Sequence, residues 1–231
     1  MTARPETSAE VAEAVREASR ILAVAGRTKP ILAKTSDAEH LDLSGLSGIM
    51  EYEPSEYVFT AKAGTLIREV QGTLREHGQY LPFDPPFAED GSTLGGMVAA
   101  GLNGPGRLRF GGLRDFLIGV TFVDGGGCLV KGGGKVVKNA AGFDFPKFLV
   151  GSLGRFGVLT ELSFKVFPQP ESYATLCLPH KDLTAGLETV LRIAGSSWEP
   201  DALELKSSGE VILRLGGTER ALAKRVEHNL K

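Results

Sequence analysis

The sequence is poor in the residues that build disulfide frameworks and metal centres. Its 231 residues include two cysteines, Cys128 and Cys177, and four histidines. The cysteines lie far apart and lack metal-ligand spacing, so we interpret them as buried thiols of a protein in a reducing compartment. No histidines pair at metal-ligand spacing, and no Ser–His–Asp or paired-carboxylate pattern occurs. The sequence therefore predicts no metal site, and it assigns no catalytic residue.

The sequence also lacks a charge imbalance and long apolar runs. Lysine and arginine number 26 against 28 aspartates and glutamates, a net charge of −2 that leaves no electrostatic footprint for nucleic acid. No uninterrupted apolar stretch is long enough to span a bilayer. The first 15 residues have no basic segment followed by an apolar core, the pattern of a secretory signal. We therefore expect a cytoplasmic protein with no membrane span and no nucleic-acid partner.

Glycine is the residue in excess, with 30 copies in short clusters between apolar runs, a pattern typical of tight turns and ligand loops. The densest run of small residues covers 91–104 and follows a proline-stiffened turn at 84–86. Because few side chains stand in the way, backbone N–H groups of such a run can approach a large anionic ligand. The run fits a dinucleotide fingerprint, a phosphate-binding helix start, or close packing between backbone elements.

A Rossmann fingerprint requires a strand directly before the glycines and a surrounding βαβ unit. Here a proline-rich turn precedes the run and antiparallel strand patterns follow it, so we reject that interpretation. No Walker lysine motif occurs either. From the residues alone, an anion-binding role and a purely structural packing role both stay open.

Local patterns predict an α+β fold. A capping box at 7–10 begins a helix, a strand pattern covers 57–63, and Thr65 is a candidate cap for a second helix that Gly78 closes. Strand patterns follow at 116–123, 128–131 and 158–166. Beyond a proline linker at 168–170, the patterns at 175–178, 183–194, 202–206, 211–215 and from 219 have the βαββα order of a partial ferredoxin-like unit.

Three segments together resemble a known family. They are Thr-Leu-Gly-Gly-Met-Val-Ala-Ala-Gly at 93–101, Phe-Gly-Gly-Leu-Arg-Asp-Phe-Leu-Ile-Gly at 110–119, and the stretch 138–161 with its Gly-Ser-Leu-Gly-Arg-Phe-Gly-Val-Leu-Thr-Glu end. Their order and spacing resemble the FAD-binding PCMH-type (vanillyl-alcohol oxidase type) flavoproteins, and most of all the FAD-binding subunit of bacterial glycolate oxidase. The resemblance covers roughly residues 10–170.

The resemblance implies a two-lobed PCMH-type FAD-binding domain at 1–168, followed by a partial ferredoxin-like cap, or substrate domain, at 171–231. Within the first domain we expect an N-terminal α/β lobe at about 1–56 and an antiparallel-sheet lobe at about 57–168. A boundary near 168–170 agrees with the two prolines there, because each bars regular structure from continuing.

The resemblance also implies which residues contact FAD. The expected contacts are Gly26, Arg27 and Thr28 in the first pyrophosphate loop, Pro86 at the flavin edge, Thr93, Gly95, Gly96, Ala100, Gly101 and Asn103 around the pyrophosphate, and Val158 through its main chain. The first loop has a single glycine where the family usually has a run, so either Arg27 or Lys29 supplies charge there or the loop is merely solvated. It has no histidine or cysteine, and we therefore expect non-covalent FAD.

By this resemblance the chain is an FAD-binding subunit of a glycolate-oxidase-like flavoprotein complex. Such a complex oxidises a 2-hydroxy acid, glycolate or D-lactate, and passes electrons through FAD. The implied partners are a second flavoprotein subunit and an iron–sulfur subunit, and the implied class is an FAD-dependent oxidoreductase. The alternative is a non-catalytic FAD-binding or assembly module with a truncated cap, since the family's substrate ligands come largely from the cap.

Overall fold

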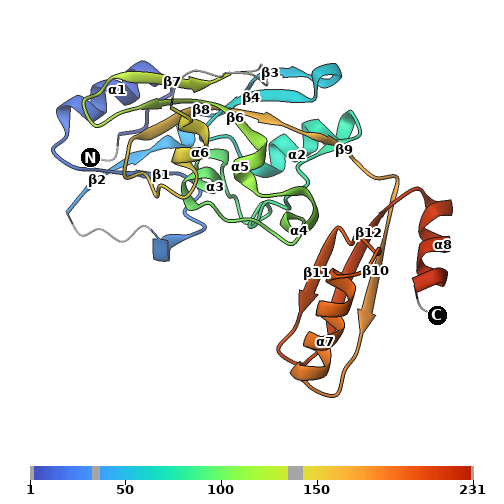
Figure 1. Ribbon diagram of the computed structural model, residues 1–231. Helices are drawn as coiled ribbons and strands as arrows, with labels where there is room; N and C mark the ends of the chain where they lie inside the picture. Colours follow the sequence, from blue (N-terminus) through green and yellow to red (C-terminus); the bar gives the residue numbers. More distant parts are fainter. Residues whose placement is uncertain (1–2, 33–36, 135–142, 230–231) are drawn as a thin grey trace. The chain divides into compact units, whose positions relative to one another are not determined.

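The structure, a computed structural model, describes residues 3–32, 37–134 and 143–229 (Figure 1). The segment 138–142 of the third resemblance motif lies outside the described residues. The chain divides into two compact units. The first unit comprises Met1–Leu81, Pro85–Leu102 and Leu113–Phe167, and the second comprises Pro82–Asp84, Asn103–Gly112 and Pro168–Lys231. The predicted boundary near residue 168 is therefore one of five points at which the chain passes between units.

A five-stranded antiparallel sheet forms the centre of the first unit. Its strands lie in the order β3 (Ile49–Glu53), β4 (Val58–Lys62), β8 (Val158–Lys165), β6 (Leu117–Val123) and β7 (Leu129–Gly133). From Thr160 onward the side chains of β8 alternate between buried and half-buried, as its sequence pattern predicts, while Val158 and Leu159 are both buried. Phe59 and Phe164 face each other across β4 and β8 with ring centroids 5.5 Å apart. Because β3 pairs with β4, this sheet begins before residue 57, the expected lobe boundary.

A second, parallel pair of strands, β1 (Ile21–Val24) and β2 (Glu39–Asp42), shares a hydrophobic core with helix α1 (Ser8–Glu17). The Thr7 side chain accepts the N–H of Glu10, which confirms the predicted cap. Figure 1 shows α1 beside the β6–β7 hairpin, where Arg16 donates to the carbonyl oxygen of Gly127 at 3.3 Å. The remaining elements of this unit are α2 (Ile67–Glu76), α3 (Leu94–Ala100), α5 (Leu113–Phe116), α6 (Phe145–Leu149), β5 (Gln79–Tyr80), and short 3-10 turns at 30–32, 43–45 and 54–56. The two-residue strand β9 (Phe167–Pro168) spans the point where the chain passes to the second unit.

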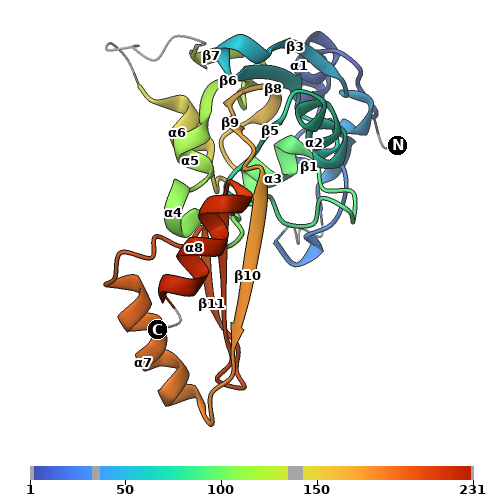
Figure 2. The same ribbon diagram turned by 90° about the vertical axis from the view of Figure 1, so that its right-hand side faces the viewer.

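The second unit has the βαββα order expected from the sequence. Its elements after residue 168 are β10 (Ser172–Leu178), α7 (Leu183–Ala194), β11 (Ala202–Leu205), β12 (Val211–Gly217) and α8 (Glu219–Asn229). The strands pair antiparallel in the order β10-β12-β11. Figure 2 shows α7 and α8 beside this sheet, where Ile193 and Leu222 join Leu213 in one core. The short helix α4 (Arg107–Phe110) also belongs to this unit.

Both cysteines are exposed, so the expectation of buried thiols is wrong. Cys128 follows the turn of the β6–β7 hairpin. Cys177 lies on β10 between Leu176 and Leu178, which pack into the core, and strand alternation therefore directs it to the opposite face. In the parts of the chain that the structure describes, no helix combines the length and the apolar composition needed to cross a membrane.

Candidate functional site

A cavity of about 930 Å³ lies in the first unit. Its walls come from strand β1, the loop at 25–30, helix α3 and the segment 153–159 that leads into β8. The volume is in the range of sites for cofactors and small molecules. The elements that surround the cavity belong to one unit, so the fold of that unit alone builds it.

The charged side chains that line the cavity are cationic. Arg27, Lys29 and Arg155 are among the lining residues, and no aspartate or glutamate of the described chain is. Most of the other lining residues are apolar or small, as in β1 and in Ala99 and Ala100. A cationic rim on apolar walls suits a ligand that has both anionic groups and flat apolar surfaces.

The loop after β1 exposes backbone donors at this cavity. The chain takes a left-handed conformation at Arg27, with φ 51°. The N–H groups of Arg27, Thr28 and Lys29 find no hydrogen-bond acceptor among the described residues. Successive free N–H groups in such a loop make a favourable site for an anion. Arg27 therefore adopts the left-handed backbone conformation that a glycine would usually provide in such a loop.

Lys29 is the cation with the most defined environment. Its Nζ donates to the hydroxyls of Thr28 at 2.7 Å and Ser92 at 2.8 Å, and it lies 5.5 Å from the ring centroid of Phe87. Partial burial lowers the pKa of Lys29. The Nζ of Lys29 contacts two hydroxyls and an aromatic ring, and no carboxylate of the described residues neutralises it. A half-buried ammonium without a counter-ion favours an anionic ligand beside it.

The backbone N–H groups at the start of helix α3 are hydrogen-bonded within the protein. The N–H groups of Leu94 and Gly95 donate to carbonyl oxygens of the segment 63–65 at 2.9 and 2.7 Å. The N–H of Gly96 donates to the Oγ1 of Thr93, the N-cap residue, at 3.2 Å. This helix start therefore differs from the expectation that it surrounds a pyrophosphate with free N–H groups.

The small residues of α3 leave open space on its cavity side. A Cβ added at Gly96 would have one neighbour within 4 Å among the described residues outside its own helix backbone, Thr93 Oγ1 at 3.1 Å. Ala99 and Ala100 line the cavity further along the same helix. Gly95 instead packs on Ala63, whose Cβ would lie 2.9 Å from an added Cβ. Small residues in this helix thus serve both the cavity and the packing behind it.

Most of the predicted contact residues meet at this cavity. Those that line it are Gly26, Arg27, Thr28, Thr93, Gly95, Gly96, Ala100 and Val158. Three others lie elsewhere. Pro86 is half-buried outside the lining, Gly101 ends α3 in a left-handed conformation against Gly151, and Asn103 belongs to the second unit.

The sequence analysis missed several lining residues. His40 lines the cavity because β2 pairs with β1, where it lies opposite Leu22, and a pairing of this kind leaves no local signal. Leu153, Gly154 and Arg155 also line it. They stand inside the third resemblance motif, so the motif itself was the signal that could have identified them.

Comparison with known proteins agrees with this geometry. The sequence model of the FAD-binding domain family matches residues 1–133. Glycolate oxidase subunit GlcE of Escherichia coli (strain K12) is 38% identical over 72% of this chain and 48% of its own length. A D-lactate dehydrogenase of Anaerostipes hadrus is 31% identical over 80% of this chain and 38% of its own length. The chain thus spans about half, or less, of the length of these relatives.

A solved structure shows the same fold. An alkyldihydroxyacetonephosphate synthase superposes with a TM-score of 0.78 at 17% identity, over 97% of this chain and 48% of that one. The residues present fit FAD, because its pyrophosphate needs cations and N–H donors and its rings need apolar walls, and the cavity offers both. The chain belongs to the family of FAD-binding domains, and FAD is its cofactor.

Proposed function

We propose that this chain is the FAD-binding part of a flavoprotein that oxidises a 2-hydroxy acid, glycolate or D-lactate. The observation that carries this proposal is the cationic cavity, whose β1, loop and α3 walls lie inside the segment that the family matches. The two relatives support the substrate class, since one is named for glycolate and the other for D-lactate, both 2-hydroxy acids.

The proposed contacts divide by chemistry. Arg27 and Lys29, with the free N–H groups of their loop, would hold the pyrophosphate. Gly96 and Ala100 would leave room for the cofactor, and the backbone at Val158 would face it. The loop 26–30 has no histidine or cysteine, so we propose a non-covalent site. His40 lines the cavity as well, and release of FAD by acid precipitation would distinguish a free cofactor from one bound to that imidazole.

When bound, FAD would supply the redox chemistry by accepting a hydride from the carbon that bears the substrate hydroxyl. The residues of this chain would bind and orient the cofactor and exclude water from it. We further propose a second flavoprotein subunit and an iron–sulfur subunit as partners, because the Escherichia coli relative is named as one subunit of an oxidase. A cytoplasmic location stays a prediction from the sequence.

The test is to purify the chain, load it with FAD and record its visible spectrum under anaerobic conditions. Bleaching of the flavin absorbance by glycolate or D-lactate, with L-lactate as the control, supports the oxidoreductase. Bound flavin that neither acid reduces supports the non-catalytic module instead. A chain that takes up no FAD overturns both.

A further inference from the structure

The chain passes from one unit to the other on both sides of helix α3. The segment 85–102, which contains α3, belongs to the first unit, yet the residues on either side of it, 82–84 and 103–112, belong to the second. Both ends of the segment 85–102 are therefore continuous with a unit whose described residues do not line the cavity.

Hydrogen bonds join the residues just before the segment 85–102 to the residues just after it. The N–H of Gly104 donates to the carbonyl oxygen of Phe83 at 3.0 Å. The N–H of Gly106 donates to Oδ2 of Asp84 at 2.7 Å. An added Cβ at Gly104 would clash with Asp84, so the two flanks approach as closely as backbone permits. The segment 85–102 is thus a loop whose two ends are joined.

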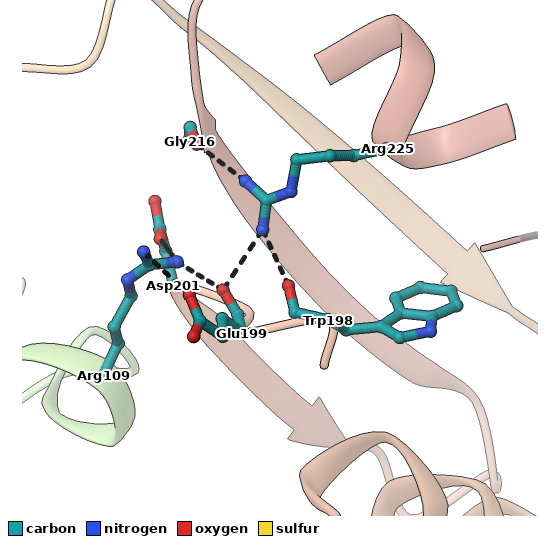
Figure 3. A network of polar contacts seen from close by, with 6 residues as sticks. All are labelled: Arg109, Trp198, Glu199, Asp201, Gly216 and Arg225. Atoms are coloured by element: carbon teal, nitrogen blue, oxygen red, sulfur yellow. Dashed lines mark hydrogen bonds and ion pairs between the residues drawn. The ribbon is translucent and has the colours of Figure 1, made fainter. Parts of the chain in front are cut away.

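Ion pairs join the first flank to strand β12 and the second flank to the residues just before strand β11. On the first flank, Arg214 of β12 donates from Nη2 to Oδ2 of Asp84 at 2.6 Å. On the second flank, Arg109 of α4 pairs through Nη1 with Oδ1 of Asp201 at 3.1 Å and through Nη2 with Glu199 at 3.6 Å (Figure 3). Each flank therefore has its own charge anchor.

The ion pair of the second flank involves a buried carboxylate, that of Asp201. The Asp201 side chain is 3% exposed, and its Oδ2 has no hydrogen-bond partner among the described residues. Gly216 leaves room for that oxygen, which an added Cβ there would clash with. Arg225 donates to the carbonyl oxygens of Gly216 and Trp198 and so fixes the same corner (Figure 3). Asp201 pairs directly with Arg109 and also interacts electrostatically with Arg214, so removing Arg109 would take away the direct ion-pair partner of a buried carboxylate, which is costly.

We propose that Arg214 and Arg109 are positioning residues for FAD binding. They fix the two ends of the 85–102 segment, although neither lines the cavity. This inference rests on the proposed placement of FAD in the cavity. Its physical reason is preorganisation: a loop whose ends are held loses less conformational freedom when a ligand orders it, so affinity rises.

The test measures FAD affinity by titrating the apoprotein of the full chain, with hydrogen exchange at the amides of Gly104 and Gly106 as a second readout. We expect Arg214→Met and Arg109→Met to bind FAD roughly tenfold more weakly than the wild type, or worse. Arg214→Lys, which keeps a cation facing Asp84, is expected to restore most of the affinity. The control is Lys206→Met, which removes an exposed ion pair with Glu210 in the same unit, and it is expected to stay within about twofold.

Asp84→Asn serves as a milder variant if Arg214→Met fails to fold, because the amide oxygen can still accept the N–H of Gly106. Faster exchange at Gly104 and Gly106 together with weaker FAD binding supports the inference. Wild-type FAD affinity in Arg214→Met, Arg109→Met and Asp84→Asn overturns it while leaving the proposed function intact. A wild-type chain that binds no FAD overturns the proposed function and this inference with it.

Discussion

The carbonyl oxygen of Gly91 occupies the place that a Cβ on Gly26 would need. The loop after β1 therefore packs backbone against backbone on the turn before α3, and the Cα of Ser92 lies 3.5 Å from the same position. Gly26, predicted from the sequence as a cofactor contact, lines the cavity and also has a packing reason to be glycine. Packing against the turn before α3 is therefore a reason for glycine at this position that does not depend on the cofactor.

Gly26→Ala is expected to lower the free energy of unfolding by about 1–3 kcal/mol, because the added methyl group forces the two loops apart. Urea titration of both proteins measures this. Gly72→Ala is the matched control, since it lies inside α2 with nothing within 4 Å of an added Cβ, and we expect it to raise stability by about 0.5–1 kcal/mol. Equal stability of Gly26→Ala and the wild type would contradict the packing described above.

Valine at Gly96 and at Gly101 is expected to act in two different ways, although the resemblance places both glycines around the pyrophosphate. Gly96→Val places its side chain in the cavity and is expected to weaken FAD binding roughly a hundredfold, about 2.7 kcal/mol, with little change in Tm. Gly101 has φ 66°, and an added Cβ would lie 2.9 Å from the Cα of Gly151. Gly101→Val is therefore expected to cost about 1–3 kcal/mol of stability.

Equilibrium titration with FAD and thermal unfolding of both variants separate these effects. A Gly96→Val protein that binds FAD normally would show that the cofactor lies elsewhere.

Lys29→Met is expected to weaken FAD binding about tenfold, or 1.4 kcal/mol, because the half-buried ammonium has no other anionic partner among the described residues. Stability is expected to change little, since methionine retains the apolar part of the side chain against Phe87. The control is Lys147→Met, which removes an exposed cation of the same unit that already pairs with Asp144. Similar FAD affinities in both variants would exclude Lys29 as a phosphate ligand.

Lys29 also predicts a pH dependence. Burial lowers its pKa, so it loses its proton below the pH at which an exposed lysine does. As pH rises through that lowered pKa, the amine becomes neutral and FAD affinity falls. Between the folded and unfolded pKa values the unfolded chain binds more protons at this site, so the contribution of Lys29 to stability rises with pH. The ratio of the Lys29→Met and wild-type Kd values is expected to approach one at alkaline pH, and a constant ratio would contradict this.

Thr93→Ala is expected to lower stability by about 1 kcal/mol, because the Thr93 hydroxyl caps α3 by accepting the N–H of Gly96. Thr93→Ser keeps the hydroxyl and is expected to keep most of that stability. Denaturant unfolding of the two variants measures the difference. If the alanine and serine variants unfold alike, the cap contributes nothing and the contact of this residue with the cavity is its main role.

The sequence predicted helices and strands well where a single short pattern of residues determines the secondary structure. The capping residue Thr7 begins α1, the alternation of β8 gives a half-buried strand, and the βαββα order of the second unit is present. Thr65 shows the limit of this reasoning. Its hydroxyl donates to the carbonyl oxygen of Lys62 and accepts the N–H of Gly48, so it is not the cap, and α2 begins after Leu66.

By itself the sequence determined the family and the cofactor, because short motifs carry the resemblance, and eight of its eleven predicted contact residues line the cavity. Only the tertiary structure decided which backbone donors are free. Thr65 and Ala63 occupy those of α3, while the loop at 27–29 keeps its own. It also decided that Asp84 and Arg109 belong with the second unit, since ion pairs to Arg214 and Asp201 join residues 130 and 92 positions apart, a separation over which no local pattern carries information.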